Sequence, residues 1–247
     1  IQAALDSGSF QLRYQPIYSV EEKRFVALEA IVGILGEGGE WIQQRDILKV
    51  AEQIGLSHWL GEAVLDRACQ WFTGNDLFSR GISSLQIRLL ESQCVELDWP
   101  RSVSRILKER NMAGSLLCLE ITEPSVVNVG ENLKLNMDLL SGQGVRFALD
   151  DYGSGYTDLG QILDMPFSHV KIDKEVVYSG LRTDKGERLL TGSVSLFTRL
   201  GLSITAEGIE TPEQSSFLTG AGCAYLQGYQ YSHPLDPESI LELLAKA

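Results

Sequence analysis

The sequence predicts an α/β fold, a modified TIM-type (β/α)8 barrel with an antiparallel first strand. About eight strand-like stretches alternate with helical patterns along 247 residues. The first two strand candidates are joined by only five residues, VEEKR, which are too few for a crossover helix, so we expect an antiparallel hairpin there. No linker or low-complexity tract divides the chain. We therefore expect residues 1–247 to form a single domain, cut from a larger multidomain protein because the chain begins at Ile1.

The strand candidates are short apolar stretches bounded by polar or glycine-containing turns. In chain order they cover 10–19, 25–34, 84–90, 116–122, 145–151, 169–173, 202–209 and 228–232. Apolar residues at helical spacing lie in the intervals between them. Three such sets and one final segment predict helices: Ile47, Val50, Ala51 and Ile54; Leu60, Val64, Ala68 and Trp71; Leu189, Val194, Phe197 and Leu200; and residues 235–247.

The charge balance excludes one class of partner. The chain has 21 Lys and Arg against 33 Asp and Glu, a formal net charge of −12. Proteins that bind nucleic acid usually present a basic patch, so we expect no nucleic-acid partner. A small anionic ligand remains compatible with this charge, because it needs only local cations or a metal.

Cysteine usage and hydropathy indicate a reducing compartment. The four cysteines are far apart and form no CxxC pair, so we interpret them as buried thiols. No apolar run approaches the roughly 18 residues that a membrane-spanning helix needs, and no signal peptide is visible. We expect a cytoplasmic domain, or the cytoplasmic part of a membrane-anchored protein.

Acidic residues recur at the ends of the predicted strands. Glu29 lies in the second strand, Glu120 ends LLCLE, Asp150 and Asp151 end FALDD, and Glu207 follows SITA. Lys171 and Asp173 lie in VKID. In a barrel these strand ends converge on one face, where active sites lie. Such a carboxylate ring suits Mg²⁺, and a lysine among the acids completes a site that could orient a water and meet a phosphate.

Seven motifs along the chain resemble those of one family. They are YQPI at 14–17, LEA at 28–30, LEITE at 119–123, DDYGSGY at 150–156, VKID at 170–173, AEGIET at 206–211 and QGY at 227–229. In this order they resemble the bacterial EAL domain, the family of cyclic-di-GMP phosphodiesterases. The resemblance covers nearly the whole chain, from 14 to 235.

The resemblance implies a set of site residues. Active members hold two divalent metals, Mg²⁺ or Mn²⁺, and a bridging water cleaves cyclic-di-GMP to linear pGpG. The implied metal ligands are Glu29, Glu120, Asp150, Asp151 and Glu207. Lys171 matches a lysine that helps activate the water, and Gln227 matches a glutamine near the second metal. Glu123 and Glu210 match acids that flank the catalytic loop 150–157. Gln15, Asp151, Glu207 and Gln227 are the implied ligand contacts.

Two positions depart from the family pattern. Gly33, in EAIVG, stands where the family has an arginine that contacts a ligand phosphate; glycine offers no donor. Arg88, in SLQIRLLESQ, aligns with an asparagine that ligates metal. A guanidinium offers only donors and a positive charge, so it cannot coordinate a cation. We hypothesise that Arg88 replaces metal charge by pairing with Glu29, Glu120 or Asp150. The alternative is a register error of one or two residues, with Arg88 pointing away from the site.

These departures favour a degenerate member of the family. We expect a non-catalytic regulatory or interaction module that needs no cofactor. It would bind cyclic-di-GMP weakly or not at all, or act through a partner protein. The first alternative is an active phosphodiesterase that uses Mg²⁺ or Mn²⁺, and the second is an unrelated metal-dependent barrel enzyme. The resemblance also implies a homodimer. We interpret the four tryptophans as packing residues and the three histidines as structural or surface residues.

Overall fold

The computed structural model describes residues 2–7, 9–36, 38–155 and 159–246. The end of the loop predicted over 150–157, and the last residue of the helix predicted over 235–247, lie outside these ranges. No helix in the described part of the chain has both the length and the apolar character that crossing a membrane requires.

Eight strands close into a barrel, and a ninth strand lies outside it. The order of neighbours is β1-β9-β8-β7-β6-β5-β4-β2-β3, and pairing of β1 with β2 completes the ring. The barrel strands are β1 (Gln11–Ser19), β2 (Arg24–Leu35), β4 (Ser84–Arg88), β5 (Leu117–Thr122), β6 (Arg146–Tyr152), β7 (His169–Ile172), β8 (Ser203–Ala206) and β9 (Tyr225–Leu226). The short β3 (Trp41–Ile42) pairs only with the end of β2.

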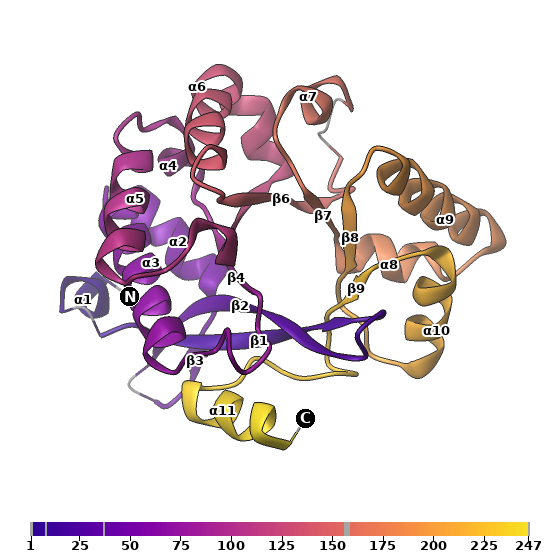
Figure 1. The fold of residues 1–247 in the computed structure, drawn as a ribbon, viewed down its shortest axis with the longest axis horizontal. Coiled ribbons are helices and arrows are strands. Elements are labelled where there is room, and N and C mark those ends of the chain that lie inside the picture. The colour runs from indigo at the N-terminus through magenta and orange to yellow at the C-terminus, as the bar shows by residue number, and fades with distance from the viewer. Residues whose placement is uncertain (1, 8, 37, 156–158, 247) are drawn as a thin grey trace.

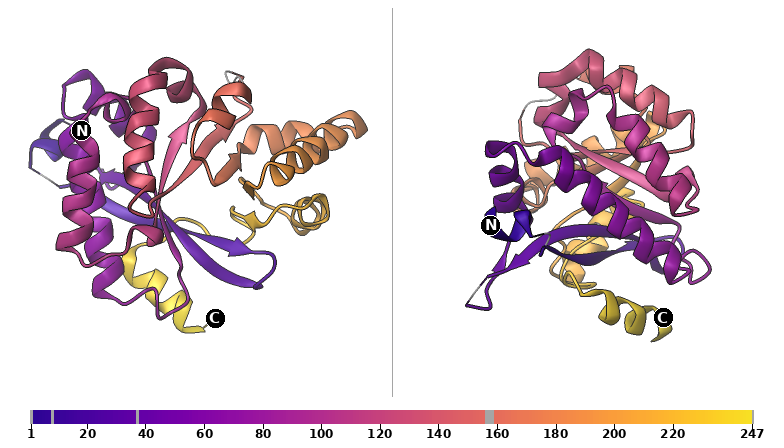
Figure 2. Two further views of the ribbon diagram at one scale, coloured as in Figure 1. Left: turned by 45° about the horizontal axis from the view of Figure 1, so that its top comes forward. Right: turned by 90° about the vertical axis from the view of Figure 1, so that its left-hand side faces the viewer.

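The predicted hairpin and barrel are confirmed. β1 runs antiparallel to both of its neighbours, β2 and β9, whereas every other pair in the ring is parallel. Five residues cannot carry the chain back to the start of a parallel neighbour, so the 20–24 connection forces the reversal. Figure 1 looks onto this ring, and Figure 2 shows from two further sides that the helices lie outside it.

Helices surround the ring and bury its outer face. They are α1 (Gln2–Asp6), α2 (Gln44–Gln53), α3 (Ser57–Gly74), α4 (Glu91–Val95), α5 (Trp99–Glu109), a 3-10 turn at Gly114–Leu116, α6 (Glu123–Ser141), α7 (Leu159–Asp164), α8 (Lys174–Gly180), α9 (Asp184–Arg199), α10 (Pro212–Ala221) and α11 (Pro237–Lys246). Alternate residues of β2, such as Leu28, Ala30 and Val32, are buried against these helices, while Glu29 between them faces the barrel interior. The four cysteines are buried and unpaired, as predicted.

The last predicted strand is misplaced. Residues 228–232 form a turn, and the strand that closes the barrel is β9, three residues earlier. The backbone of Gly228 lies directly against Ile209, where a Cβ atom would come within 2.2 Å of the Ile209 nitrogen. The Tyr231 amide donates back to the Gly228 carbonyl at 3.0 Å. This close approach and turn end the extended conformation that the aromatic pattern predicted.

Candidate acid ring and its two cations

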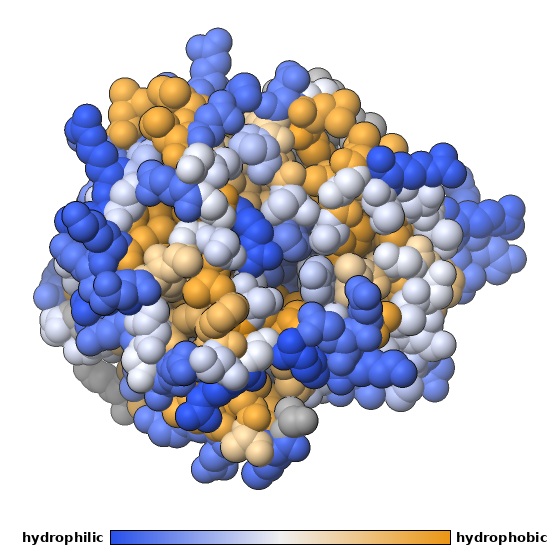
Figure 3. All heavy atoms as spheres, viewed as in Figure 1, coloured by the Kyte–Doolittle hydropathy of each residue, from blue (hydrophilic) through white to orange (hydrophobic). Residues whose placement is uncertain are grey.

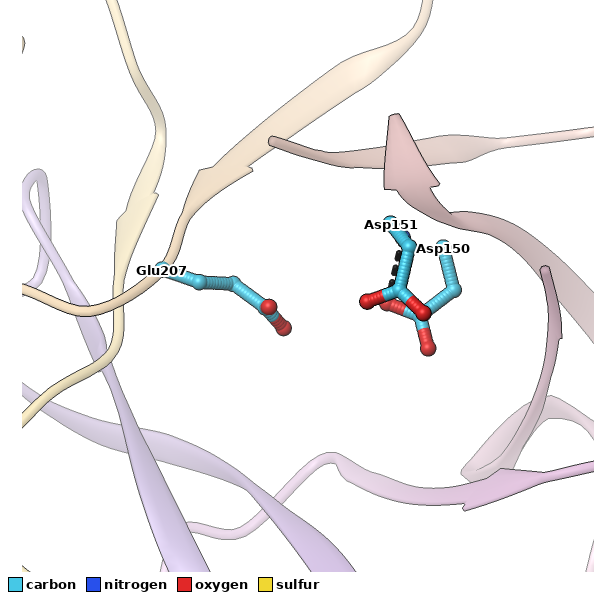
Figure 4. A group of neighbouring side chains, drawn as sticks. All are labelled: Asp150, Asp151 and Glu207. Atoms are coloured by element: carbon cyan, nitrogen blue, oxygen red, sulfur yellow. Dashed lines mark hydrogen bonds between the residues drawn. The ribbon is translucent and has the colours of Figure 1, made fainter. Parts of the chain in front are cut away.

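The strand ends place the predicted acids on one face. In the parallel ladders, Arg88 of β4 lies beside Glu120 of β5, and Thr122 of β5 lies beside Asp150 of β6. Glu207 directly follows β8. Figure 4 shows Asp150 and Asp151 on one side of the opening and Glu207 on the other, with their carboxylates pointing toward one another. The barrel therefore brings together acids from distant parts of the sequence, as the strand-end pattern predicted.

Lys171 lies at the centre of this group. Its ammonium Nζ is 2.6 Å from Glu120 Oε1, 2.8 Å from Glu207 Oε1 and 3.0 Å from Glu29 Oε2. Asp150 Oδ1 lies at 3.8 Å. Lys171, Glu120 and Asp150 are almost completely buried, at 1%, 0% and 0% exposure. Burial lowers the pKa of Lys171, but the surrounding carboxylates outweigh burial and raise it well above its usual value, so the lysine is a fixed cation here.

Arg88 is the second cation of the site. Its Nη2 donates to Asp150 Oδ2 in a very short contact and lies 3.1 Å from Asp151 Oδ1. Burial raises the pKa of Asp150, yet Arg88 and Lys171 hold that pKa below its usual value. Arg88 therefore points into the acid ring, and its side chain pairs with Asp150 and Asp151 rather than with Glu29 or Glu120.

Three acids of the ring have a raised pKa and so hold a proton more tightly than usual. Burial and the neighbouring Glu29 raise the pKa of Glu120 well above its usual value. Burial raises the pKa of Glu207 to about 7, although Lys171 opposes this shift. Asp151 has its pKa raised by burial and by Asp150, and its backbone lies in the left-handed region at φ 55°. In these three acids the protonated form is therefore more favoured than it is in a solvent-exposed carboxyl.

The two glutamines join the ring to the β1 strand. Gln227 Nε2 donates to Glu29 Oε2 at 2.6 Å and to Gln15 Oε1 at 3.3 Å. Gln15 Nε2 in turn donates to the Ser232 carbonyl at 3.2 Å. Gln15 and Gln227 therefore lie at the site, where the family resemblance expects ligand contacts.

A cavity of about 240 Å³ opens beside the ring. Its lining includes six residues that the sequence analysis named: Gln15, Glu29, Arg88, Glu207, Glu210 and Gln227. Lys174, Tyr178 and Tyr229 also line it and were not predicted; Tyr229 belongs to the QGY motif, and Lys174 directly follows VKID. In Figure 3, hydrophilic side chains gather in a hollow at the centre of the face that Figure 1 shows.

Glu123 holds the loop after β6. Its Oε2 accepts from the Gly153 amide at 3.0 Å, the Ser154 hydroxyl at 3.0 Å and the Gly155 amide at 3.4 Å. Glu210 hydrogen-bonds the Tyr178 hydroxyl and raises its pKa, together with burial, to about 12. Asp173 does not join the ring: its carboxylate accepts from the Glu175 amide and caps α8.

The space beside Gly33 is filled by an aromatic ring. A Cβ atom at position 33 would lie 1.8 Å from Trp41 Cζ2, so the indole packs directly on the glycine backbone. No phosphate donor projects from position 33, and none could without moving Trp41.

The ring fits a divalent cation only in part. Asp150, Asp151 and Glu207 each offer an oxygen, and these three atoms lie within 4.8 Å of one another. Mg²⁺ prefers oxygen ligands and near-octahedral geometry. Arg88, however, occupies oxygens of Asp150 and Asp151, and Lys171 holds an oxygen of Glu207. The three donors are therefore already paired with cations of the chain, and a metal could take them only if Arg88 and Lys171 moved away.

Comparison with known proteins gives one consistent family. The model of the EAL domain matches residues 1–234. The signaling protein YkoW of Bacillus subtilis is 27% identical over 99% of this chain and 30% of its own length. The bifunctional diguanylate cyclase/cyclic di-GMP phosphodiesterase MucR of Pseudomonas aeruginosa is 29% identical over 99% of this chain and 36% of its own length. This chain thus spans about a third of these relatives.

The solved structures agree with the strand order described above. The PaMucR phosphodiesterase in complex with c-di-GMP superposes with a TM-score of 0.90 at 29% identity, covering 97% of each chain. Agreement at this level extends over the barrel, the hairpin and the surrounding helices together.

Proposed function

This chain belongs to the EAL domain family, and we propose that it serves cyclic-di-GMP signalling as a non-catalytic regulatory module. The observation that carries the proposal is the pairing of Arg88 with Asp150 and Asp151. These carboxylates are the oxygens that a catalytic metal would need. A guanidinium between them supplies the positive charge from the chain itself and repels a divalent ion at short range.

Lys171 pairs with the remaining acids of the ring. It contacts Glu29, Glu120 and Glu207 at 3.0 Å or less. Each of the five acids of the ring therefore contacts either Arg88 or Lys171. The loss of a single metal ligand or its support typically reduces metal affinity or activity about 10–100-fold. Replacement of a ligand by a cation costs more, because repulsion is added. The ring thus stays folded with no need of an ion.

Binding of cyclic-di-GMP is expected to be weak. The cavity beside the ring keeps Gln15, Gln227 and Glu207, which offer hydrogen bonds to a ligand. It is bordered by Glu29, Glu207 and Glu210 as well as by Arg88 and Lys174, but Arg88 is paired with carboxylates and position 33 offers no donor for a phosphate. The module would then act through weak ligand occupancy or through contacts with a partner protein. The homodimer remains a prediction of the family resemblance.

A second candidate function is hydrolysis of cyclic-di-GMP to pGpG. Two observations favour it: the oxygens of Asp150, Asp151 and Glu207 lie close together, and the buried atoms Glu120 Oε2 and Gln227 Oε1 have no hydrogen-bond partner in the described ranges. Bound Mg²⁺ or Mn²⁺ would supply an activated water in that case. Asp150, Asp151 and Glu207 would hold the metal, and Arg88 would have to leave them.

Hydrolysis in the presence of Mg²⁺ or Mn²⁺ separates the two functions. The native chain should produce no pGpG, while Arg88→Asn should gain metal binding, measured by calorimetry on the same preparations. An active phosphodiesterase serves as the positive control for the assay. Production of pGpG by the native chain at a useful rate would overturn the non-catalytic proposal. Cyclic-di-GMP binding tighter than about 1 μM would contradict the expectation of weak affinity.

A further inference from the structure

Arg13 is a further cation at the mouth of the barrel, outside the acid ring. Arg13 is in β1, opposite Ile31 of β2, while Gln15 is opposite Glu29. Alternate residues of a strand share a face, so Arg13 lies on the same face as Gln15, which lines the cavity. Along β2, Glu29 and Gly33 share that face as well. Arg13 is therefore one pleat beyond the cavity, toward the end of β2.

Trp41 holds the guanidinium of Arg13 in place. The Arg13 Cζ atom lies 4.0 Å from the centroid of the Trp41 ring, and the same indole packs on the Gly33 backbone. A cation stacked on an indole is attracted by the ring and keeps a defined plane. Glycine at position 33 is what leaves room for the ring. Trp41 thus contacts both Gly33 and Arg13, and the three residues pack together.

The guanidinium of Arg13 has no acidic partner among the residues that the structure describes, and none of its contacts is a hydrogen bond. By contrast, Arg88 and Arg110, which are also partly buried, each pair with a carboxylate. In a chain with 33 acids and 21 Lys and Arg, a half-buried arginine that avoids carboxylates keeps its donors for an external anion. A guanidinium fork matches the oxygens of phosphate in a paired geometry.

We propose that Arg13, stacked on Trp41, binds a phosphate group of a phosphodiester ligand at the barrel mouth. This inference rests on the proposed function for the identity of the probe, cyclic-di-GMP. The cavity is lined by the acids Glu29, Glu207 and Glu210 and by two cations, Lys174 and Arg88, of which Arg88 is already paired with Asp150 and Asp151. Arg13 meets the phosphate beyond those acids, so the ligand keeps its anionic group outside the ring. The affinity that the chain retains for cyclic-di-GMP depends on this residue.

The test is a titration of the chain with cyclic-di-GMP in EDTA, followed by calorimetry. Arg13→Gln should weaken binding about 10-fold or more, and Arg13→Lys should weaken it less, because lysine keeps the charge but loses the fork. Trp41→Leu, which removes the support but leaves the arginine, should also weaken binding. The matched control is Arg101→Gln, because Arg101 is 85% exposed on α5 and pairs only with Asp98 at the surface.

The outcomes distinguish this inference from the proposed function. Unchanged binding by Arg13→Gln would overturn the inference, and so would the absence of binding by the native chain up to about 1 mM cyclic-di-GMP. Neither result bears on catalysis, because EDTA removes the metal. Conversely, hydrolysis by the native chain in Mg²⁺ would overturn the non-catalytic proposal and leave the loss of affinity in Arg13→Gln unaffected.

Discussion

Arg88 and Lys171 each separate carboxylates that would otherwise face one another across the barrel. Arg88 stands between Asp150 and Asp151, and Lys171 stands among Glu29, Glu120 and Glu207. Removal of one partner from such a cluster leaves charge without compensation, which is more costly than never having buried it. The two cations therefore have structural effects that can be measured without any ligand.

Arg88→Asn should be destabilising without metal and respond to Mg²⁺. The substitution leaves Asp151 without a cation and Asp150 with only the longer 3.8 Å contact to Lys171, which we expect to cost roughly 2 kcal/mol, because Arg88 is partly exposed. Added Mg²⁺ should recover this loss, since the asparagine oxygen can join the carboxylates. Thermal unfolding of the native and variant chains, each with EDTA and with Mg²⁺, measures both effects. A larger rise of the midpoint with Mg²⁺ in the native chain than in Arg88→Asn would contradict the prediction.

Gly33 and Trp41 should behave as a coupled pair. Gly33→Ala places a methyl group against the indole and should cost about 1–3 kcal/mol, as overpacking does. Trp41→Leu should remove most of that cost in the double variant, which a double-mutant cycle of urea unfolding would show. Gly192→Ala in α9 is the control, because the space around Gly192 is open and alanine should be neutral or stabilising there. Additive costs at 33 and 41 would contradict the packing described here.

The loop after β6 is held by a side chain of α6, the helix that precedes β6 in the chain. Glu123 lies at the start of α6 and accepts from Gly153, Ser154 and Gly155, so one carboxylate fixes three consecutive residues. This tether fixes the start of the loop that directly follows Asp151 and Tyr152 at the end of β6.

Glu123→Ala should release that loop while the barrel remains folded. Hydrogen–deuterium exchange of the Gly153 and Gly155 amides should become faster, because the carboxylate that accepts from them is lost, while the amides of β5 should stay protected. Glu131→Ala, on the exposed face of α6, is the matched control. If exchange of the Gly153 and Gly155 amides is the same in both variants, Glu123 does not hold the loop.

The sequence predicts most strands of the barrel but not the two shortest ones, β3 and β9. The eight-strand pattern located β1, β2, β4, β5, β6, β7 and β8, because each is a buried apolar run with clear boundaries. Residues 228–232 misled because their aromatic spacing resembles a strand, while the turn is decided by the contact of Gly228 with Ile209, a residue distant in sequence. The two-residue β3 carries too little pattern to be seen, and only its pairing with β2 defines it.

The residues of the candidate site could be predicted from the sequence where barrel closure alone determines their position. Closure of the strands brings Glu29, Glu120, Asp150 and Glu207 together from their strand ends, so a list of strand ends was sufficient. Asp173 fits the same list but caps α8, because a carboxylate just before a helix finds the free amides of its first turn. The contact of Arg13 with Trp41 depends on side-chain packing across the hairpin, which spacing alone does not encode.

The stability of the whole barrel should depend on pH through His169. This histidine is 8% exposed at the start of β7, and burial together with Arg146 lowers its pKa to about 4. Between the unfolded value near 6.5 and about 4, the unfolded chain binds the proton and the folded chain does not. The free energy of unfolding therefore falls as the pH drops through this window.

His169→Gln should lose that contribution to the pH dependence. The native chain should lose roughly 2–3 kcal/mol more than the variant between pH 6.5 and pH 4, measured by urea unfolding at a series of pH values. His233→Gln, at an exposed position, is the control and should follow the native curve. Equal slopes for the native chain and His169→Gln would contradict this, because they would mean that the His169 imidazole binds its proton equally well in the folded and the unfolded chain.

The two cations inside the ring also decide what the domain can sense. A barrel that needed divalent ions to neutralise its centre would soften whenever the supply of magnesium fell. Here the counter-ions are covalently part of the chain, as Lys171 and Arg88. The shape of the barrel mouth should therefore not depend on the concentration of divalent ions in the cell. Under the proposed function, a partner that contacts this mouth would meet the same surface with and without Mg²⁺.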